Sequence, residues 1–330
     1  MLLKRIRVKN FKSFGEFDID LGKLNVFIGS NAAGKSNFIS LLKFIRDVLN
    51  HGLENALSMQ GGSEFIANYI LDQKVCKFYF EFLNEKNESI KLDFSLDLGE
   101  LEKDPNYQDR FNEKFFNTDS SVLSYLKNCA IYDFNPTIPK MATSLFGKAD
   151  LEEDGSNLAI VLRKLLKDEE NRRAFINLVS DVLPFVANIK VERYLDRYLN
   201  ILVNEKYVEG RDIPSYFLSD GTVFVIDMII ALYFEDKTMA VFEEAGRRIH
   251  PQMIAKMIDM MKEVAEKKQI FLSTHNPEIV KYAGAENIIL VHRDDNGCST
   301  LSRPHDKQEI RRFLQNDIGI EELFVQNQLK

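Results

Sequence analysis

The sequence predicts an α/β fold in which strands and helices alternate around a mixed sheet. Three observations support this prediction. The apolar run from Leu24 to Ile28 is followed by a glycine-bounded loop and by a helical pattern from Asn37 to Leu49. Two further short apolar runs, Thr238 to Phe242 and Gln269 to Ser273, each end in polar residues and are separated by a helical pattern. Alternating β and α patterns of this kind are typical of parallel strands that are connected by helices.

Length and composition are those of an ordinary globular protein. The chain has 330 residues, of which 45% are hydrophobic and 28% charged, so it can build one large or two medium cores. The net charge of −7 argues against a broadly basic surface that coats nucleic acid, but it leaves room for a local basic patch. The three cysteines are far apart and lack CxxC spacing, which indicates thiols in a reducing compartment.

Export and membrane signals are not visible in the sequence. Residues Met1 to Asn10 alternate basic and apolar side chains and lack the uninterrupted apolar segment of a signal peptide. The longest apolar stretch, Val223 to Phe234, is interrupted by Asp227 and is too short to span a bilayer. We therefore expect a cytoplasmic protein with no membrane partner.

The N-terminal third of the chain reads mainly as strands. Residues 2–9 alternate apolar and basic side chains, which suits a half-buried strand, and residues 17–21 are a second strand that would pair with it. Alternation returns over residues 77–83 and 89–98, with the polar residues 84–87 between them. This pattern predicts a β-hairpin.

The middle of the chain is more irregular. Residues 99–120 are acidic, polar and poor in aliphatic side chains, so we expect a loop or short helices there, and Pro136 and Pro139 then interrupt the chain. The remaining elements of this region are two helices and a second hairpin, at 151–168, 171–183, 189–195 and 198–205.

The last third of the chain contains several recognisable motifs and element boundaries. The stretch Leu218-Ser219-Asp220-Gly221-Thr222 opens a strongly apolar helix that extends to Phe234, with Ser219 or Asp220 placed to cap it. The buried strand over 238–242 ends in Glu243 and Glu244, and the strand over 269–273 ends in Thr274-His275-Asn276-Pro277. The other predicted elements are a helix, a hairpin and a final helix, at 251–267, at 287–291 with 299–302, and from Asp306 onward.

The loop after the first apolar strand has the pattern of a phosphate-binding P-loop, Gly29-Ser30-Asn31-Ala32-Ala33-Gly34-Lys35-Ser36. In this motif, backbone N–H groups and a helix N-terminus surround the phosphates of a nucleotide. Gly29 and Gly34 allow tight turns close to the phosphates, Lys35 would reach the β- and γ-phosphate oxygens, and the Ser36 hydroxyl would bind Mg²⁺. A glycine-serine turn that fits the pattern by chance is disfavoured, because four fixed positions and both flanks agree.

Several motifs in a fixed order resemble those of the ABC-type ATPase heads of the SMC/RecF/OLD group. Within that group, the chain is similar to compact bacterial ATPases of DNA-repair and phage-defence systems. The resemblance extends over nearly the whole chain, and each motif is weak when taken alone. Besides the P-loop, the stretches that carry it are Asn10-Phe11-Lys12-Ser13-Phe14, Asp154-Gly155-Ser156-Asn157-Leu158-Ala159, Leu218-Ser219-Asp220-Gly221-Thr222, Glu243-Glu244, Ile249-His250-Pro251 and Ser273-Thr274-His275-Asn276-Pro277.

The resemblance implies a site for ATP and Mg²⁺. Glu244 takes the place of the general base, His275 that of the switch histidine that contacts the γ-phosphate, and Lys35 completes the catalytic set. Glu243 takes the metal-supporting place together with Ser36. The implied ATP-binding residues are Lys12, Ser13, Asn31, Ala32, Ala33, Gly34, Lys35, Ser36 and Asn37. Without the P-loop upstream, adjacent acids would read as a solvated strand end and His275 as a surface residue.

The signature stretch Ser219, Asp220 and Gly221 has a different implied role. In the family this loop completes the site of a second subunit, so that two heads enclose two ATP molecules in a homodimer or a higher oligomer. Helix N-termini attract anions, which suits this role. Ser219 also fits an ordinary helix cap, and both readings can hold together.

The sequence departs from the family pattern at four places. Glu243 stands where Asp is usual, and Ala32 stands where Gly is frequent. The segment Ala245-Gly246-Arg247-Arg248 replaces a common Pro-Glu, which leaves the coupling between two sites open. The glutamine that commonly bridges Mg²⁺ and water has no obvious equivalent; Asn135 is the candidate.

The resemblance implies one ATPase head over 1–330. Residues 1–130 and 235–330 would form the nucleotide-binding lobe with the mixed sheet, and 131–234 an inserted, mostly helical lobe with the signature. The irregular middle excludes the long coiled coil of SMC proteins, and the segment after His275 is too short for the nuclease domain of OLD proteins. Asp294-Asp295 fits a hairpin turn better than a nuclease metal site.

The function expected from these features is ATP-dependent pairing of two heads, undone by hydrolysis. Since the chain shows no effector of its own, its output would pass to a separate protein, such as a nuclease or toxin, in anti-phage defence or DNA repair. A nucleotide-gated scaffold with little turnover and direct RecF-like DNA binding are the alternatives. A transporter ATPase is disfavoured. Basic residues that could touch DNA or a partner, or simply be solvated, are Arg172, Arg173, Lys190, Arg193, Arg197, Arg311 and Arg312.

Overall fold

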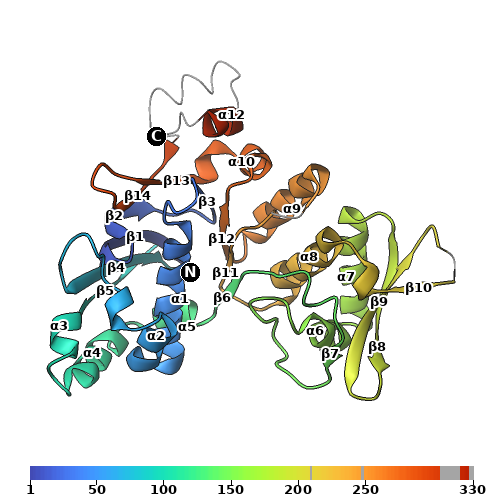
Figure 1. Cartoon of the computed structure of the whole chain (residues 1–330), viewed down its shortest axis with the longest axis horizontal. Coiled ribbons are helices and arrows are strands. Elements are labelled where there is room, and N and C mark those ends of the chain that lie inside the picture. Colours follow the sequence, from blue (N-terminus) through green and yellow to red (C-terminus); the bar gives the residue numbers. More distant parts are fainter. Residues whose placement is uncertain (209, 247–248, 305–319, 327–330) are drawn as a thin grey trace. The chain divides into compact units, whose positions relative to one another are not determined.

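The computed structural model describes residues 1–208, 210–246, 249–304 and 320–326 (Figure 1). The chain forms two compact units. The first consists of Met1–Ile131, Lys237–Glu244 and Ala265–Lys330, and the second of Tyr132–Asp236 and Ala245–Val264. The inserted lobe that the resemblance implies spans 131–234, whereas the second compact unit spans 132–236 and 245–264. The final helix that we expected from Asp306 onward begins outside the described residues.

A mixed sheet of ten strands dominates the first unit, which confirms the predicted fold class. Its strand order is β5-β4-β1-β2-β14-β13-β3-β12-β11-β6. The strands β11, β12, β3 and β13 pair parallel with one another in that order, and β14 pairs antiparallel with β13 and parallel with β2. The strands β2, β1, β4 and β5 pair antiparallel with one another in that order. The bounds are β1 Leu2–Phe11, β2 Phe14–Asp20, β3 Leu24–Ile28, β4 Val75–Leu83, β5 Ser89–Asp97, β6 Cys129–Tyr132, β11 Met239–Phe242, β12 Gln269–Thr274, β13 Ile288–Arg293 and β14 Ser299–Ser302.

Helices cover the sheet and close its core. In Figure 1, α1, α2, α4 and α5 gather on one side of the sheet, and they share one apolar core with β1–β5. Phe38 of α1 stacks on Phe27 of β3 with ring centroids 4.1 Å apart, which anchors the helix that starts at the P-loop. The helices of this unit are α1 Lys35–His51, α2 Leu53–Met59, α3 Leu98–Leu101, α4 Tyr107–Phe116, α5 Ser120–Lys127, α10 Pro277–Ala283 and α12 Ile320–Val325.

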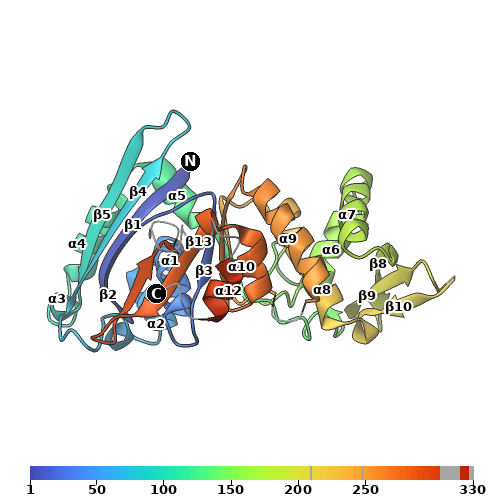
Figure 2. The same ribbon diagram turned by 90° about the horizontal axis from the view of Figure 1, so that it is seen from above.

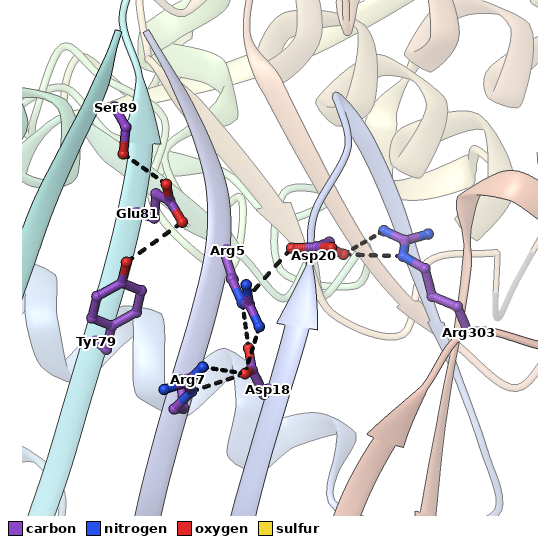
Figure 3. Close-up of polar contacts among 8 residues, drawn as sticks. All are labelled: Arg5, Arg7, Asp18, Asp20, Tyr79, Glu81, Ser89 and Arg303. Atoms are coloured by element: carbon purple, nitrogen blue, oxygen red, sulfur yellow. Dashed lines mark hydrogen bonds and ion pairs between the residues drawn. The ribbon is translucent and has the colours of Figure 1, made fainter. Parts of the chain in front are cut away.

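The other face of the antiparallel strands is solvated and carries paired charges. Figure 2 shows β1, β4 and β5 side by side, and Figure 3 shows Arg5 and Arg7 of β1 meeting Asp18 of β2. Arg5 Nε lies 2.6 Å from Asp18 Oδ1, and Arg7 Nη2 lies 2.6 Å from Asp18 Oδ2. Arg7 also sits over the ring of Tyr79 at 5.7 Å. Such cross-strand pairs specify the register of a sheet.

Replacing Asp18 by Asn is expected to lower stability slightly at neutral pH. The hydrogen bond from Arg5 lowers the pKa of Asp18, so its ionised form favours the folded state. A carboxylate with a depressed folded pKa stabilises the protein above its unfolded pKa, and this contribution is lost as the pH falls through the folded pKa. Urea unfolding at several pH values should therefore show a difference from wild type that disappears in acid. Asp93→Asn, at an exposed position of β5, is the control. A stability difference between Asp18→Asn and wild type that persists at low pH would refute the stabilising role of the Asp18 carboxylate.

The second unit combines helices with a four-stranded sheet, in which β8 and β9 confirm the second predicted hairpin. The strands are β7 Thr143–Ser144, β8 Val186–Tyr194, β9 Tyr198–Glu205 and β10 Asp212–Pro214. The helices are α6 Leu158–Leu165, α7 Glu169–Val182, α8 Asp220–Ile229, which continues as the π-helical turn Ile230–Phe234, and α9 Pro251–Val264. Across the described parts of both units, no helix is long and apolar enough to cross a membrane.

Candidate functional site

The P-loop connects the fully buried strand β3 to helix α1, as the sequence predicts. Two glycines are required by the local geometry. A Cβ at Gly29 would lie 2.3 Å from the carbonyl oxygen of Val291, and a Cβ at Gly34 would lie 2.4 Å from Ser299 Oγ. Gly34 also has φ +121°, a conformation that L side chains rarely adopt. Ala32, which stands where the family often has Gly, has φ 60°.

Side chains from distant parts of the chain brace the loop. Arg293 at the end of β13 donates to the Ala32 carbonyl from Nε at 3.1 Å and from Nη2 at 2.9 Å. Ser299 of β14 donates to the Ala33 carbonyl at 2.5 Å, and its Oγ lies 2.8 Å from Ser13 Oγ. The loop is therefore held in shape before any ligand is bound, which reduces the entropy cost of binding phosphates.

Lys35 is folded back onto the loop that it would use to bind phosphate. Its Nζ donates to the carbonyl of Gly29 at 2.9 Å and to that of Ser30 at 3.2 Å. Burial lowers the pKa of Lys35, while the carboxylates of Glu244 and Glu243 raise it. Thus a buried ammonium group and two acidic side chains share one electrostatic environment.

The acidic pair and His275 follow the two strands next to the P-loop strand. In the parallel segment β3, β12 and β11, Thr274 pairs with Ile28 and Phe242 pairs with Leu272. Because parallel strands have their carboxyl ends at one edge, residues that follow them gather at that edge. The structure therefore brings Glu243, Glu244 and His275 to the edge where the P-loop begins.

Glu244 has two local constraints. Its φ is 49°, which is uncommon for a residue with a side chain, and its backbone N–H donates to Ser273 Oγ at 3.1 Å. Its Oε2 lies 2.6 Å from His275 Nδ1. The side chain of Glu244 is 23% exposed and that of His275 is 46% exposed, so water can reach both groups.

A cavity of about 480 Å³ lies beside the P-loop. Ser13 connects the cavity to the P-loop, because its Oγ accepts a hydrogen bond from Asn37 Nδ2 at 2.6 Å and lies 2.8 Å from Ser299 Oγ. Burial lowers the pKa of Lys12, which lines the same cavity and has φ 47°. The lining residues are Lys12, Ser13, Asn37, Gln60, Gly61, Phe65, Asn68, Tyr69, Ile70 and Arg293.

The signature residues lie in the second unit, at the start of α8. Ser219 is the N-cap, and its Oγ accepts a hydrogen bond from the Thr222 N–H at 3.0 Å. Asp220 is in the first turn, and Gly221 is buried. The cap reading of Ser219 is therefore confirmed, and its hydroxyl also contacts Thr222 Oγ1 at 2.8 Å.

The other candidates occupy varied positions. Ser36 and Asn31 of the P-loop are exposed, and Ala33 is buried. Asn135, in the second unit, is exposed, and its Oδ1 accepts from Thr137. Asp294 closes the β13–β14 hairpin through a 2.8 Å bond from its N–H to the Cys298 carbonyl, which confirms the turn reading. The predicted candidates Arg247, Arg248, Arg311 and Arg312 lie outside the described residues.

Sequence patterns did not reveal several residues of this site. Arg293 and Ser299 lie in a hairpin more than 250 residues from the P-loop, so only the sheet topology brings them there. The cavity-lining residues between Gln60 and Ile70 stand in no recognisable motif. Ser273 belongs to the same motif as His275, but only His275 was expected to act at the site. The hydroxyl of Ser273 near the end of β12 was the sequence feature that could have identified it.

Comparisons with known proteins identify a family for most of the chain. Residues 24–281 match the family described as "AAA domain, putative AbiEii toxin, Type IV TA system". A stretch of 52 residues is 38% identical to the DNA replication and repair protein RecF of Streptococcus uberis, and it covers 16% of this chain and 14% of that protein. The chain therefore matches only a small part of the length of that relative.

Solved structures share the fold. The structure of an Smc head bound to the C-terminal winged-helix domain of ScpA has a TM-score of 0.59 at 16% identity, and the match covers 92% of this chain and 98% of that one. The Smc head with an extended coiled coil, bound to the C-terminal domain of ScpA from Pyrococcus furiosus, has a TM-score of 0.56 at 15% identity, over 95% and 99% of the two chains. At these identities the likeness concerns the fold alone.

Proposed function

Because this chain belongs to the family described as an AAA domain, putative AbiEii toxin of a type IV TA system, within the SMC/RecF group of ATPases, we propose that it binds and hydrolyses ATP. The observation that carries the proposal is the convergence of Lys35, Glu244 and His275. All three residues come after the carboxyl ends of three adjacent parallel strands, β3, β11 and β12. A phosphate-binding loop, a carboxylate and an imidazole at one site are the groups that phosphoryl transfer to water needs.

In the proposed reaction, Lys35 leaves the carbonyls of Gly29 and Ser30 and binds the phosphate oxygens. Glu244 orients the attacking water and accepts its proton. With a proton on Nδ1, His275 donates to Glu244 Oε2 and holds the carboxylate in place. The bond from the Glu244 N–H to Ser273 fixes the backbone of the base, so the side chain is positioned before the substrate arrives.

The residues present fit a magnesium ion that arrives with the nucleotide. Mg²⁺ keeps several waters and needs only one or two protein oxygens besides the phosphates. Ser36 is exposed at the start of α1 and Glu243 is half-buried directly after β11, and these two residues would hold the ion. Bound Mg²⁺ supplies positive charge that offsets the charge on the transferring phosphoryl group.

We place the base and ribose of ATP in the cavity beside the P-loop. Its walls combine the exposed aromatic rings of Phe65 and Tyr69 with polar groups such as Asn37 and Asn68. Flat rings provide stacking surfaces for a base, and Lys12 and Arg293 keep the cavity positive.

Replacing Tyr69 by Ala is therefore expected to weaken ATP binding about 10-fold while leaving inorganic triphosphate binding unchanged, because stacking on one ring contributes on the order of 1–3 kcal/mol per base. Calorimetric titration with both ligands measures the difference. Met59→Ala removes another exposed apolar side chain of this unit, outside the cavity, and is the control. An equal loss for both ligands would instead indicate a disturbed P-loop.

We further propose that ATP pairs two heads through Ser219 and Gly221, and that hydrolysis releases them to control a separate effector in defence or repair. Two observations support this. Ser219 and Gly221 lie at the N-terminus of a ten-residue helix, where N–H groups attract anions. The Smc heads named above are bound to domains of a separate protein, ScpA. The scaffold alternative keeps the pairing and omits turnover.

Phosphate release by the purified chain with Mg-ATP, measured beside its sedimentation, tests both parts. Hydrolysis together with an ATP-dependent dimer is the expected result. Binding and dimerisation without turnover would favour the scaffold. A chain with no affinity for Mg-ATP would end the proposal.

A further inference from the structure

Large apolar side chains lie exposed beside the signature turn of the second unit. We call the following four residues the signature patch: Ile138, Met141, Tyr216 and Phe217, which are 37%, 60%, 64% and 73% exposed. Single exposed apolar residues are ordinary on protein surfaces, but a contiguous group usually marks a contact with another molecule.

The patch is formed by two segments that are bonded to each other. Ser215 Oγ donates to the Lys140 carbonyl at 3.1 Å, and the Lys140 ammonium forms an ion pair with Asp220. The Lys140 side chain is only 16% exposed, so this contact is an integral part of the turn. The bonds therefore place residues 138–141 beside residues 215–217, directly before the Ser219 cap.

Local bonds also order each segment. The Met141 N–H donates to the Ile138 carbonyl, and the Leu218 N–H donates to the Ser215 carbonyl, both at 3.0 Å. The rings of Tyr216 and Phe217 pack edge to face with centroids 5.3 Å apart. Since these apolar groups are held on an ordered backbone, a partner would bind them without a large entropy cost.

The charge of the patch selects the kind of partner. The charge that Lys140 brings is balanced by Asp220, so the patch suits an apolar, neutral surface better than the phosphates of a nucleic acid. The first unit carries exposed apolar side chains on one wall of the cavity beside the P-loop. Phe65, Tyr69 and Ile70 are 47%, 71% and 53% exposed there.

We propose that the signature patch of one copy binds the Phe65, Tyr69 and Ile70 side of the cavity in a second copy. The inference rests on the proposed head pairing and adds the contact that closes the base side of each ATP. Each copy carries both surfaces, so a twofold arrangement makes the contact twice. Two such apolar contacts would supply the buried core that phosphate contacts alone lack.

The test uses Glu244→Gln chains, in which ATP should persist, and replaces Tyr216 and Phe217 together by Ser. Sedimentation with Mg-ATP is expected to show a dimer dissociation constant raised at least about 10-fold, as for loss of a central aromatic contact. Affinity of the monomer for Mg-ATP should not change. Tyr207→Ser, at a turn of the same unit where the side chain is 82% exposed, is the matched control. Both altered side chains are exposed, so folding should be retained, and thermal unfolding checks this.

A cross-link supplies a second readout. Chains with Ile70→Cys and chains with Phe217→Cys are mixed and treated with a short bis-maleimide; the native cysteines are buried. Cross-linked pairs that require Mg-ATP support the contact. An undiminished dimer after the double Ser change, or no cross-link, would overturn it and leave head pairing intact. If the Glu244→Gln parent binds ATP and stays monomeric, head pairing fails and the contact fails with it.

Discussion

Replacing Glu244 by Gln is expected to slow phosphate release at least about 100-fold, the scale on which general bases contribute, while ATP affinity is retained. The amide keeps the shape of the side chain and removes its basicity. The backbone constraint at this position, the N–H bond to Ser273 Oγ, does not depend on the side chain and should survive. The loss should therefore appear in turnover rather than in binding, which is the signature of an interaction made only in the transition state.

Single-turnover phosphate release and equilibrium binding of Mg-ATP, measured on the same preparation, separate the two effects. Glu278→Gln alters an acid of α10 that lies three residues after His275 and serves as the control. An unchanged turnover rate would reject Glu244 as the base. A wild-type chain that binds ATP without turnover would instead make the chain a scaffold, in which the contact between Glu244 and His275 is structural.

The strands of the first unit could be predicted because their patterns are strong. Strand β1 alternates along its length, and β3, β11 and β12 are short buried runs, each with polar residues or glycine directly after it. A parallel arrangement of such strands places their carboxyl ends together. The patterns therefore place the P-loop, the acidic pair and His275 each directly after a buried strand, whereas the adjacency of those strands is seen only in the fold.

Elements whose sequence lacks a regular spacing of apolar residues were missed or misplaced. Strand β6 has four residues, Cys129–Tyr132, all buried, and such a short apolar run has no alternation to detect. Helix α6 begins at Leu158, whereas the apolar spacing suggested a start at Leu151. Gly155 has φ +77°, and the Asn157 side chain bonds the carbonyls of Lys148 and Asp150, so a loop forms where a helix was expected.

The residues that support the P-loop could not be predicted from the sequence, because they reach it through contacts between segments that are distant in the chain. Neither Arg293 nor Ser299 stands in a recognisable motif, yet both bond the carbonyls of the P-loop. They reach it because β13 pairs with β3 and β14 pairs with β13. Sheet order in a ten-stranded mixed sheet is not fixed by local patterns, so residues that act through it become visible only in the fold.

Replacing Lys35 by Met is expected to give the largest loss of ATP binding, at least about 100-fold, because a charge-assisted contact to phosphate is removed from a partly desolvated site. A second effect adds to the first. Lys35 shares its surroundings with Glu243 and Glu244, whose negative charge would be left facing the phosphates. Repulsion between like charges then opposes the ligand that the ammonium attracted.

The stability of the ligand-free chain should change in the opposite direction. Burial lowers the pKa of Lys35 below its ordinary value, so the unfolded chain binds this proton more tightly and the charged group disfavours the folded state at neutral pH. Methionine removes that cost, and the melting temperature without ATP should equal or exceed that of wild type. The wild-type chain should gain stability when Mg-ATP is added, and the Lys35→Met chain should not.

Thermal unfolding with and without Mg-ATP measures both effects in one experiment. Lys23→Met, which changes an exposed lysine just before β3, should keep the stabilisation by ATP. A Lys35→Met chain that unfolds early without ligand would show a structural role for the ammonium, through its bonds to Gly29 and Ser30. Retained stabilisation by ATP would contradict phosphate binding at this loop. Loss of stabilisation in a chain that otherwise unfolds like wild type would locate the triphosphate at Lys35, because folding and binding are then separated at a single residue.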